Sequence, residues 1–129
     1  MIELLAFNLE EQGHSIITAG AGREALEKAR AFLPDLILLD LMLPDLDGIS
    51  ISEILRRQPA TREIPIIMIT ALGGEIARLA AFDSGVNDYL RKPFSPRELV
   101  KQVDDLLRGY ESKTQSVKAH RVGVNLGDK

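Results

Sequence analysis

Three side chains of types that handle phosphoryl groups each follow a short, mostly apolar segment of the sequence. They are Asp40 after residues 36–39, Thr70 after residues 64–69, and Lys92 close after residues 88–90. Taken singly, each has an ordinary explanation, because Asp often begins a turn, Thr often caps a loop and Lys is usually solvated. The carboxyl ends of parallel strands, however, meet at one edge of a sheet, where such folds bind their ligands. Three such side chains at equivalent positions therefore predict one shared site.

Phosphoryl transfer is the chemistry that these residue types favour. A carboxylate such as Asp40 can act as a nucleophile toward an activated phosphoryl group. The transfer needs little beyond positioning and neutralisation of the charge on the phosphoryl oxygens. Lys92 would supply a positive charge, the Thr70 hydroxyl would donate to one oxygen, and Mg²⁺ normally bridges carboxylates and phosphoryl groups. The sequence has no Gly-rich phosphate loop with its lysine, so a nucleotide is not the expected donor.

The segments that must position these residues alternate between helix and strand patterns. Apolar residues at helical spacing predict helices over residues 2–12, around 25–33, around 51–55, around 76–80 and from 95 to about 109. The expected buried face of the second helix consists of Ala25, Leu26, Ala29 and Leu33. Short apolar runs predict strands over residues 14–19, 36–39, 64–69 and 88–90. This order predicts an α/β fold, an open and doubly wound parallel sheet with helices on both faces.

The last helix has a clear start signal. Ser95 is placed to be the N-cap, Pro96 the first helical residue, and Glu98 the partner of Ser95 in a capping box. Gly109 stands where this helix is expected to end.

The composition excludes several classes of protein. The 129 residues suit one domain, and 16 Lys and Arg against 19 Asp and Glu give a net charge of −3, which argues against a nucleic-acid-binding surface. The lack of cysteine excludes disulfides, thiolate zinc sites and a cysteine nucleophile. Apolar runs are too short for a membrane-spanning helix, and the first residues lack the pattern of a signal peptide. We therefore expect an acidic cytoplasmic domain without membrane contact.

Three motifs carry a resemblance to a known family. The segments DLILLDLMLPDLDG, IPIIMITA and DYLRKPFSPREL stand in the order and at the spacing of receiver domains of bacterial two-component response regulators. KPFSPREL resembles in particular the subfamily with a winged-helix DNA-binding output (OmpR/PhoB type). The resemblance extends from about Ile2 to Arg108. It implies a flavodoxin-like, receiver-type fold.

The resemblance also implies roles for individual residues. Asp40 matches the phosphoacceptor, which takes a phosphoryl group from a sensor histidine kinase. Thr70 matches the hydroxyl residue that follows the phosphoryl group, Lys92 the family's lysine, and Tyr89 the aromatic residue that rotates inward in the switch. Met42 matches the position whose backbone carbonyl binds Mg²⁺.

Other residues near the site receive weaker assignments. The bond between Lys92 and Pro93 is cis in the family, a geometry that proline makes accessible. Asp45 and Asp47 are interpreted as turn residues, and Gly48 serves the backbone there.

The family's first strand, and the acidic pair at its end, have no counterpart before Asp40. Glu10-Glu11 lies late in the first predicted helix and cannot occupy that position. The Mg²⁺ site would then consist of Asp40 and the Met42 carbonyl, so its affinity for the metal should be weakened or lost. The missing strand is central in the family's order 2-1-3-4-5, and its absence leaves two strand edges open for pairing.

Three explanations of this gap stay open. The chain could be a piece of an ordinary regulator, a receiver that works without phosphorylation, or a receiver in which another segment fills the gap. Residues 1–109 are expected to form the receiver domain without its first strand, and residues 110–129 a linker or tail. The tail piece HRVGVNL alternates like a strand and could insert within its own chain or in a strand-swapped dimer. The linker, or the start of a lost output domain, is the favoured interpretation.

The subfamily dimerises through its fourth helix, fifth strand and fifth helix, using crossed ion pairs. Arg78 and Glu98 match one such pair, and Asp88 is kept. Gln102 stands where an arginine partner is expected, and Asn87 replaces an acid. Because exposed ion pairs are individually weak, a homodimer through this face stays an expectation with fewer ion pairs than usual.

The expected function is that of a two-component receiver that switches a protein-contact surface and thereby takes part in transcription regulation. Apart from its own phosphotransfer, the domain is not expected to be an enzyme. Phosphorylation of Asp40 would add about −1.5 to −2 charge and shift an existing equilibrium at the fourth helix and fifth strand. The alternative is a phosphorylation-independent interaction module, or an inactive fragment, because the acidic pair is absent.

Overall fold

The computed structural model describes residues 10–11, 13–43, 45–71, 73–114 and 121–125 of the chain. Of the helix predicted over residues 2–12, only Glu10 and Glu11 belong to the described part, and both are helical. The rest of that prediction lies outside the described residues.

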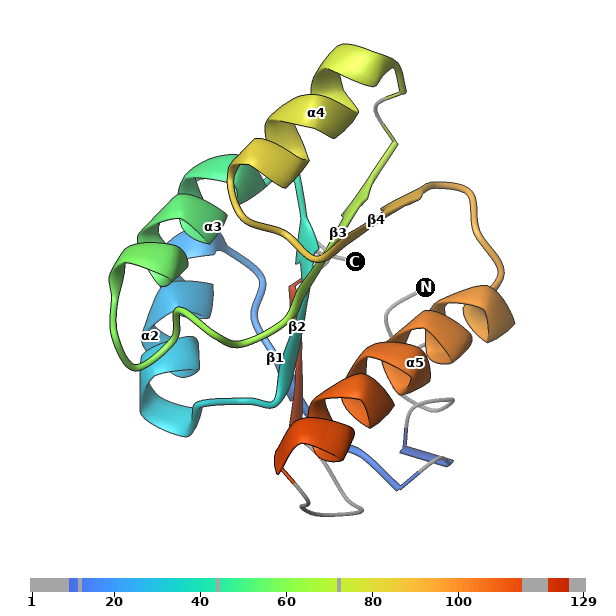
Figure 1. Ribbon diagram of the computed structural model, residues 1–129. Coiled ribbons are helices and arrows are strands. Elements are labelled where there is room, and N and C mark those ends of the chain that lie inside the picture. The colour runs from blue at the N-terminus through green and yellow to red at the C-terminus, as the bar shows by residue number, and fades with distance from the viewer. Residues whose placement is uncertain (1–9, 12, 44, 72, 115–120, 126–129) are drawn as a thin grey trace.

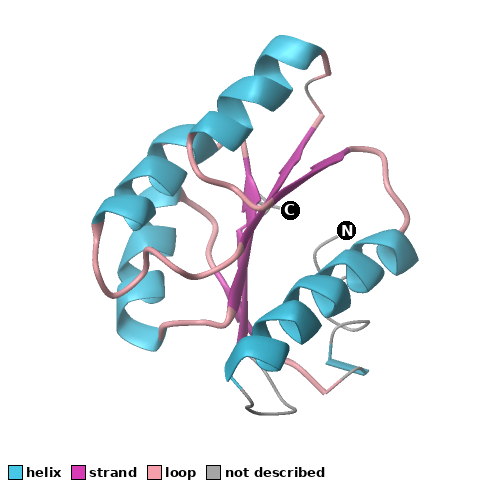
Figure 2. Cartoon of the chain, in the orientation of Figure 1, coloured by secondary structure: helices cyan, strands magenta, loops and turns pink. Residues whose placement is uncertain are grey.

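A five-stranded parallel sheet forms the centre of the described structure (Figure 2). Its strands are β1 (Ser15–Thr18), β2 (Leu36–Asp40), β3 (Ile66–Thr70), β4 (Asp88–Arg91) and β5 (Arg121–Asn125). They lie in the order β1-β5-β2-β3-β4, and every neighbouring pair is parallel. The predicted α/β class with a parallel sheet is confirmed.

The last strand, β5, occupies the position between β1 and β2 that the four predicted strands would leave open. Its residues pair with Ser15–Thr18 of β1 on one side and with Leu36–Leu39 of β2 on the other. The linker interpretation is therefore wrong for residues 121–125, which form a strand paired within their own chain. The physical reason is that the two open edges present rows of N–H and C=O groups, which an added strand satisfies.

Helices lie on both faces of this sheet. In the described part of the chain they are α2 (Gly22–Phe32), α3 (Gly48–Arg57), α4 (Glu75–Asp83) and α5 (Pro96–Thr114). Figure 1 shows α2, α3 and α4 on one side of the sheet and α5 on the other. The predicted capping box starts α5, because the Glu98 N–H donates to Ser95 Oγ at 3.1 Å and the Ser95 N–H to Glu98 Oε1 at 3.4 Å.

Alternate residues of the central strands fill two separate apolar clusters. Leu36 and Leu38 of β2 pack with the buried face of α5, formed by Leu99, Val103 and Leu107. On the other face, a second cluster joins the sheet to the helices α2 and α3, through Ile37, Leu39, Ile66, Met68, Leu26, Ala29, Ile51 and Leu55. Because both faces are covered, β2 and β3 are buried along their whole length.

Two helix ends differ from the predicted ones. Leu33, expected on the buried face of α2, is instead its C-cap residue, with φ of 46° and 49% exposure. The helix stops there because Pro34 follows. At the other end of the chain, α5 continues past Gly109 to Thr114. A single glycine costs about 1 kcal/mol relative to alanine inside a helix, which does not by itself end one.

The helix α4 leaves exposed much of the apolar pattern from which the sequence predicts it. Ile76 is 86% exposed and Leu79 is 51% exposed, whereas Ala81 is fully buried. The first turns of α4 therefore present an apolar surface to solvent.

Candidate functional site

Asp40 and Lys92 are in direct contact at the carboxyl end of the sheet. Lys92 Nζ donates to Asp40 Oδ2 at 2.9 Å, and the Met42 N–H donates to Asp40 Oδ1, also at 2.9 Å. The Asp40 side chain is only 7% exposed, whereas that of Lys92 is 31% exposed. A carboxylate so far removed from water needs such donors, and together the two bonds fix its orientation.

Thr70 ends the neighbouring strand β3 and is buried. It is in register with Arg91 of β4, and its carbonyl oxygen accepts a hydrogen bond from the Lys92 N–H at 2.7 Å. Asp40 is in register with Ile69, the residue before Thr70. The structure therefore brings all three predicted residues to adjacent strand ends.

Tyr89, the fourth predicted residue, contacts α4. Its ring lies 6.4 Å from that of Phe82, and the guanidinium of Arg78 lies 5.1 Å from the same Phe82 ring. Tyr89 is half-buried and packs against the cluster under α2 and α3. Its position thus connects β4, which leads into Lys92, with the exposed helix α4.

The loop after Asp40 folds back tightly on the end of β2. The Gly48 N–H donates to the Leu41 carbonyl at 2.8 Å, and the Leu41 N–H donates to the Ile69 carbonyl at 3.0 Å. A Cβ at position 48 would lie 2.6 Å from the Asp40 carbonyl oxygen and 2.9 Å from Leu41 Cα. Only glycine allows this approach without a backbone shift, which explains the expected role of Gly48.

Asp47 and Asp45, interpreted from the sequence as turn residues, each cap a helix. Asp47 is the N-cap of α3 and accepts from the Ser50 N–H at 2.8 Å. Asp45 accepts from the N–H groups of Gly22 and Arg23, at 2.7 Å and 3.1 Å, in the first turn of α2. These hydrogen bonds from the backbone of Arg23 and Gly22 hold the pKa of Asp45 below its ordinary value. Of these two caps, only that of Asp47 has a local signal in the sequence, because its partner Ser50 lies three residues on.

Arg56 of α3 is a structural residue that the sequence reasoning missed. Its Nε donates to the Gly85 carbonyl and its NH1 to the Ile64 carbonyl, both at 2.8 Å, and its NH2 donates to Asn87 Oδ1 at 3.0 Å. Asn87 Oδ1 also accepts from the Ile66 N–H at 2.8 Å. Burial lowers the pKa of the Arg56 guanidinium. This fork fixes α3 against the segments that lead into β3 and into β4.

The Asp40 carboxylate and the Met42 carbonyl supply only part of the Mg²⁺ site that the resemblance implies. Mg²⁺ takes six oxygen ligands, usually including more than one carboxylate or phosphate. In residues 10–11, 13–43, 45–71, 73–114 and 121–125, no group of three or more His, Cys, Asp or Glu side chains could hold a metal ion. The described residues therefore do not by themselves fit the ion.

Comparison with known proteins places the chain among signalling regulators. Residues 1–104 match the response regulator receiver domain family. The chain is 46% identical over 111 residues to the alkaline phosphatase synthesis transcriptional regulatory protein PhoP of Bacillus subtilis (strain 168), covering 86% of this chain and 45% of the relative. It is 41% identical over 125 residues to the DNA-binding dual master transcriptional regulator RpaA of Synechocystis sp., covering 97% of this chain and 52% of the relative. The chain thus spans about half the length of these relatives.

A solved structure gives the same assignment of the fold. The receiver domain of the sensor histidine kinase PA1611 from Pseudomonas aeruginosa PAO1, crystallised with magnesium in its active site cleft, superposes with a TM-score of 0.74. It is 34% identical, and the match covers 83% of this chain and 85% of that one.

No helix in the described part of this chain has both the length and the apolar character needed to span a bilayer.

Proposed function

This chain belongs to the response regulator receiver domain family, and we propose that it accepts a phosphoryl group on Asp40 from a sensor histidine kinase. We further propose that phosphorylation switches a protein-contact surface in a protein that controls transcription. Receiver domains interact with histidine kinases, and relatives such as PhoP and RpaA carry names of transcriptional regulators. The site at the end of β2 supports the proposal at the level of individual atoms.

The observation that carries the proposal is the contact between Lys92 Nζ and Asp40 Oδ2 at 2.9 Å. A fixed cation beside a nucleophilic carboxylate is suited to a reaction that brings negative phosphoryl oxygens to that carboxylate. A contact-only module would need neither the buried carboxylate nor its cation. The phosphorylation-independent alternative is therefore the less favoured function.

In the proposed transfer, an Asp40 oxygen bonds to phosphorus while the bond from phosphorus to the donor histidine nitrogen breaks. That nitrogen keeps the electron pair. Lys92 moves from the carboxylate to the phosphoryl oxygens, which carry the added charge, and the Thr70 hydroxyl donates to one of them. The Met42 N–H holds the second carboxylate oxygen at 2.9 Å and keeps the attacking oxygen turned toward the donor. Receiver domains bind Mg²⁺ as a family, but the described residues of this chain do not complete a site for it.

The proposed output surface is the face of α4, β4 and α5, which correspond to the family's fourth helix, fifth strand and fifth helix. Two copies would associate through this face. Ile76 and Leu79 give this face exposed apolar area. Arg78, expected to pair with Glu98 of a second copy, lies 3.5 Å from Glu75 of its own helix. Glu98 is engaged with Ser95 in the capping box. Both would have to exchange these local contacts for contacts across the dimer, so we expect a weak association that phosphorylation strengthens.

The proposed function is tested by intact mass after incubation with acetyl phosphate, with and without Mg²⁺. The native chain should gain about 80 Da, the mass of one phosphoryl group, and Asp40→Asn should gain nothing. Light scattering before and after the reaction reports the association. A native chain that melts cooperatively but gains no mass under any condition would contradict the proposed function.

A further inference from the structure

The loop from Leu41 to Asp47 is held at a point that lies outside the phosphoacceptor site. Asp45 Oδ1 accepts from the Gly22 N–H at 2.7 Å and from the Leu46 N–H at 2.8 Å, and Asp45 Oδ2 accepts from the Arg23 N–H at 3.1 Å. The N-cap residue of α2 is Ala21, whose side chain has no oxygen to offer. A carboxylate from a distant loop thus caps the first turn of α2, where it also interacts favourably with the helix dipole.

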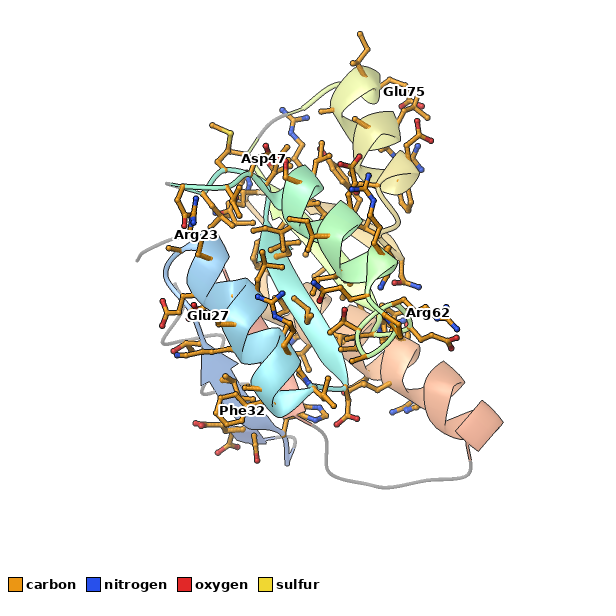
Figure 3. The ribbon with its side chains drawn as sticks, turned by 90° about the vertical axis from the view of Figure 1, so that its left-hand side faces the viewer. Arg23, Glu27, Phe32, Asp47, Arg62 and Glu75 are labelled. Carbon is orange, nitrogen blue, oxygen red and sulfur yellow. The ribbon has the colours of Figure 1, made fainter. Side chains whose placement is uncertain are left out.

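The packing around this cap is close on the Gly22 side. A Cβ at Gly22 would lie 2.8 Å from Leu46 Cβ and 2.9 Å from Ile51 Cδ1. The side chains of Leu46 in the loop and of Ile51 in α3 therefore pack closely against the backbone at the start of α2, beside the Asp45 carboxylate. Figure 3 shows Arg23, at the start of α2, and Asp47, at the start of α3, at the same end of the molecule, with Phe32 at the opposite end of α2.

The same loop supplies a donor to the reacting carboxylate. Met42, three residues before Asp45, donates its N–H to Asp40 Oδ1. The side chain of Met42 is 62% exposed and cannot anchor the loop by burial. The loop is held by Leu41, Leu43 and Leu46, which pack in the second apolar cluster. It is also held by its turn at Gly48, by the Asp47 cap on α3, and by Asp45 on α2.

We propose that Asp45 is a positioning residue of the phosphoacceptor site, which holds the loop after β2 against the N-terminus of α2 so that the Met42 N–H fixes the Asp40 carboxylate. This inference rests on the proposed function of Asp40. The lowered pKa of Asp45, caused by the backbone N–H groups of Arg23 and Gly22, agrees with a carboxylate that is ionised in this role.

The chain offers a matched control at the same helix end. Glu24 Oε1 accepts from the Gly20 N–H at 2.9 Å, and backbone hydrogen bonding also lowers the pKa of Glu24. Its carboxylate caps the segment before α2 from within that helix and does not bridge to the loop. Asp45→Ala and Glu24→Ala both remove a carboxylate from the start of α2, but only the first releases the loop.

The test combines phosphorylation kinetics with amide hydrogen exchange, well below the melting transition of every variant. With acetyl phosphate as donor, Asp45→Ala should lower the maximal phosphorylation rate about tenfold, as loss of a supporting contact commonly does. Asp45→Asn, whose amide oxygen can still accept one N–H, should recover part of that rate. Glu24→Ala should stay within about a factor of two of the native rate. The Met42 amide should exchange faster in Asp45→Ala and at the native rate in Glu24→Ala.

The outcomes separate this inference from the proposed function. Equal rates and equal Met42 exchange in the native chain, Asp45→Ala and Glu24→Ala would overturn the role of Asp45 while leaving the role of Asp40 intact. If the native chain takes no phosphoryl group, the proposed function fails, and hydrogen exchange at Met42 alone decides whether Asp45 holds the loop.

Discussion

Leu39 of β2 and Asn125 of β5 are register partners, so the last strand of the chain runs beside the strand that ends in Asp40. A strand taken from the end of the sequence thereby supports the strand that carries the phosphoacceptor. The pairing of β5 with both β1 and β2 makes it an interior strand of the sheet.

A proline in the interior of β5 should therefore weaken the whole domain. Val124→Pro removes a backbone N–H from a strand with neighbours on both sides, and a buried group left without its hydrogen bond costs about 1–3 kcal/mol. We expect urea denaturation to show at least this loss. Lys118→Pro, outside the described strand, serves as the control. Equal midpoints for the native chain and Val124→Pro would mean that β5 contributes no stability to the sheet.

The pair of Asp40 and Lys92 predicts a coupling that stability measurements can detect. Lys92→Met leaves a carboxylate of 7% exposure without its cation, and we expect a loss of about 1–3 kcal/mol in the free energy of unfolding. Adding Asp40→Asn to that variant removes the charge and should restore most of the loss. Additive effects of the two substitutions in urea denaturation would argue against the contact.

The contribution of Asp45 to stability should depend on pH. Because its pKa in the folded chain is lowered, its contribution is fully present above the ordinary value of about 3.9 and is lost as the pH falls through the folded value. The gap in melting temperature between the native chain and Asp45→Ala should therefore be constant near neutral pH and close as the pH falls below about 4. A gap that widens on acidification would contradict the assignment of an ionised cap.

Arg56 should be far more sensitive to substitution than its neighbour Arg57. Arg56→Met removes donors from the carbonyls of Gly85 and Ile64 and from Asn87. With about 1 kcal/mol for each hydrogen bond, we expect a loss of about 2–4 kcal/mol in thermal or urea denaturation. Arg57→Met changes an exposed residue of the same helix and should leave stability nearly unchanged. Similar losses for both variants would show that the fork is not a specific support.

The residues at the strand ends could be predicted because a parallel sheet brings the carboxyl ends of its strands to the same edge. Asp40, Thr70 and Lys92 each follow an apolar run, and parallel strands carry such positions to one edge. The capping box of Ser95 and Glu98 was equally accessible, since its partners lie three residues apart. In these cases the physical signal is local or fixed by the fold class.

The roles of Asp45 and Arg56 were not predicted because both side chains act across long chain separations. Asp45 caps α2 by accepting from the N–H groups of Gly22 and Arg23, which lie 23 and 22 positions before it in the chain. Arg56 donates to the carbonyl of Gly85, 29 positions after it. Neither contact leaves a local pattern. The insertion of HRVGVNL as a strand is the less favoured interpretation of the sequence for a different reason, because five alternating residues suit a linker as well as a strand until two open edges are available.

The most direct test of the central claim locates the phosphoryl group within the chain. After reaction with acetyl phosphate and digestion with trypsin, the peptide spanning residues 31–56 should carry the added mass of about 80 Da. Fragmentation should place it on Asp40, and the corresponding peptide of Asp40→Asn should stay unmodified. Modification of Asp35, Asp45 or Asp47, or of any peptide without Asp40, would contradict the assignment of Asp40 as the acceptor.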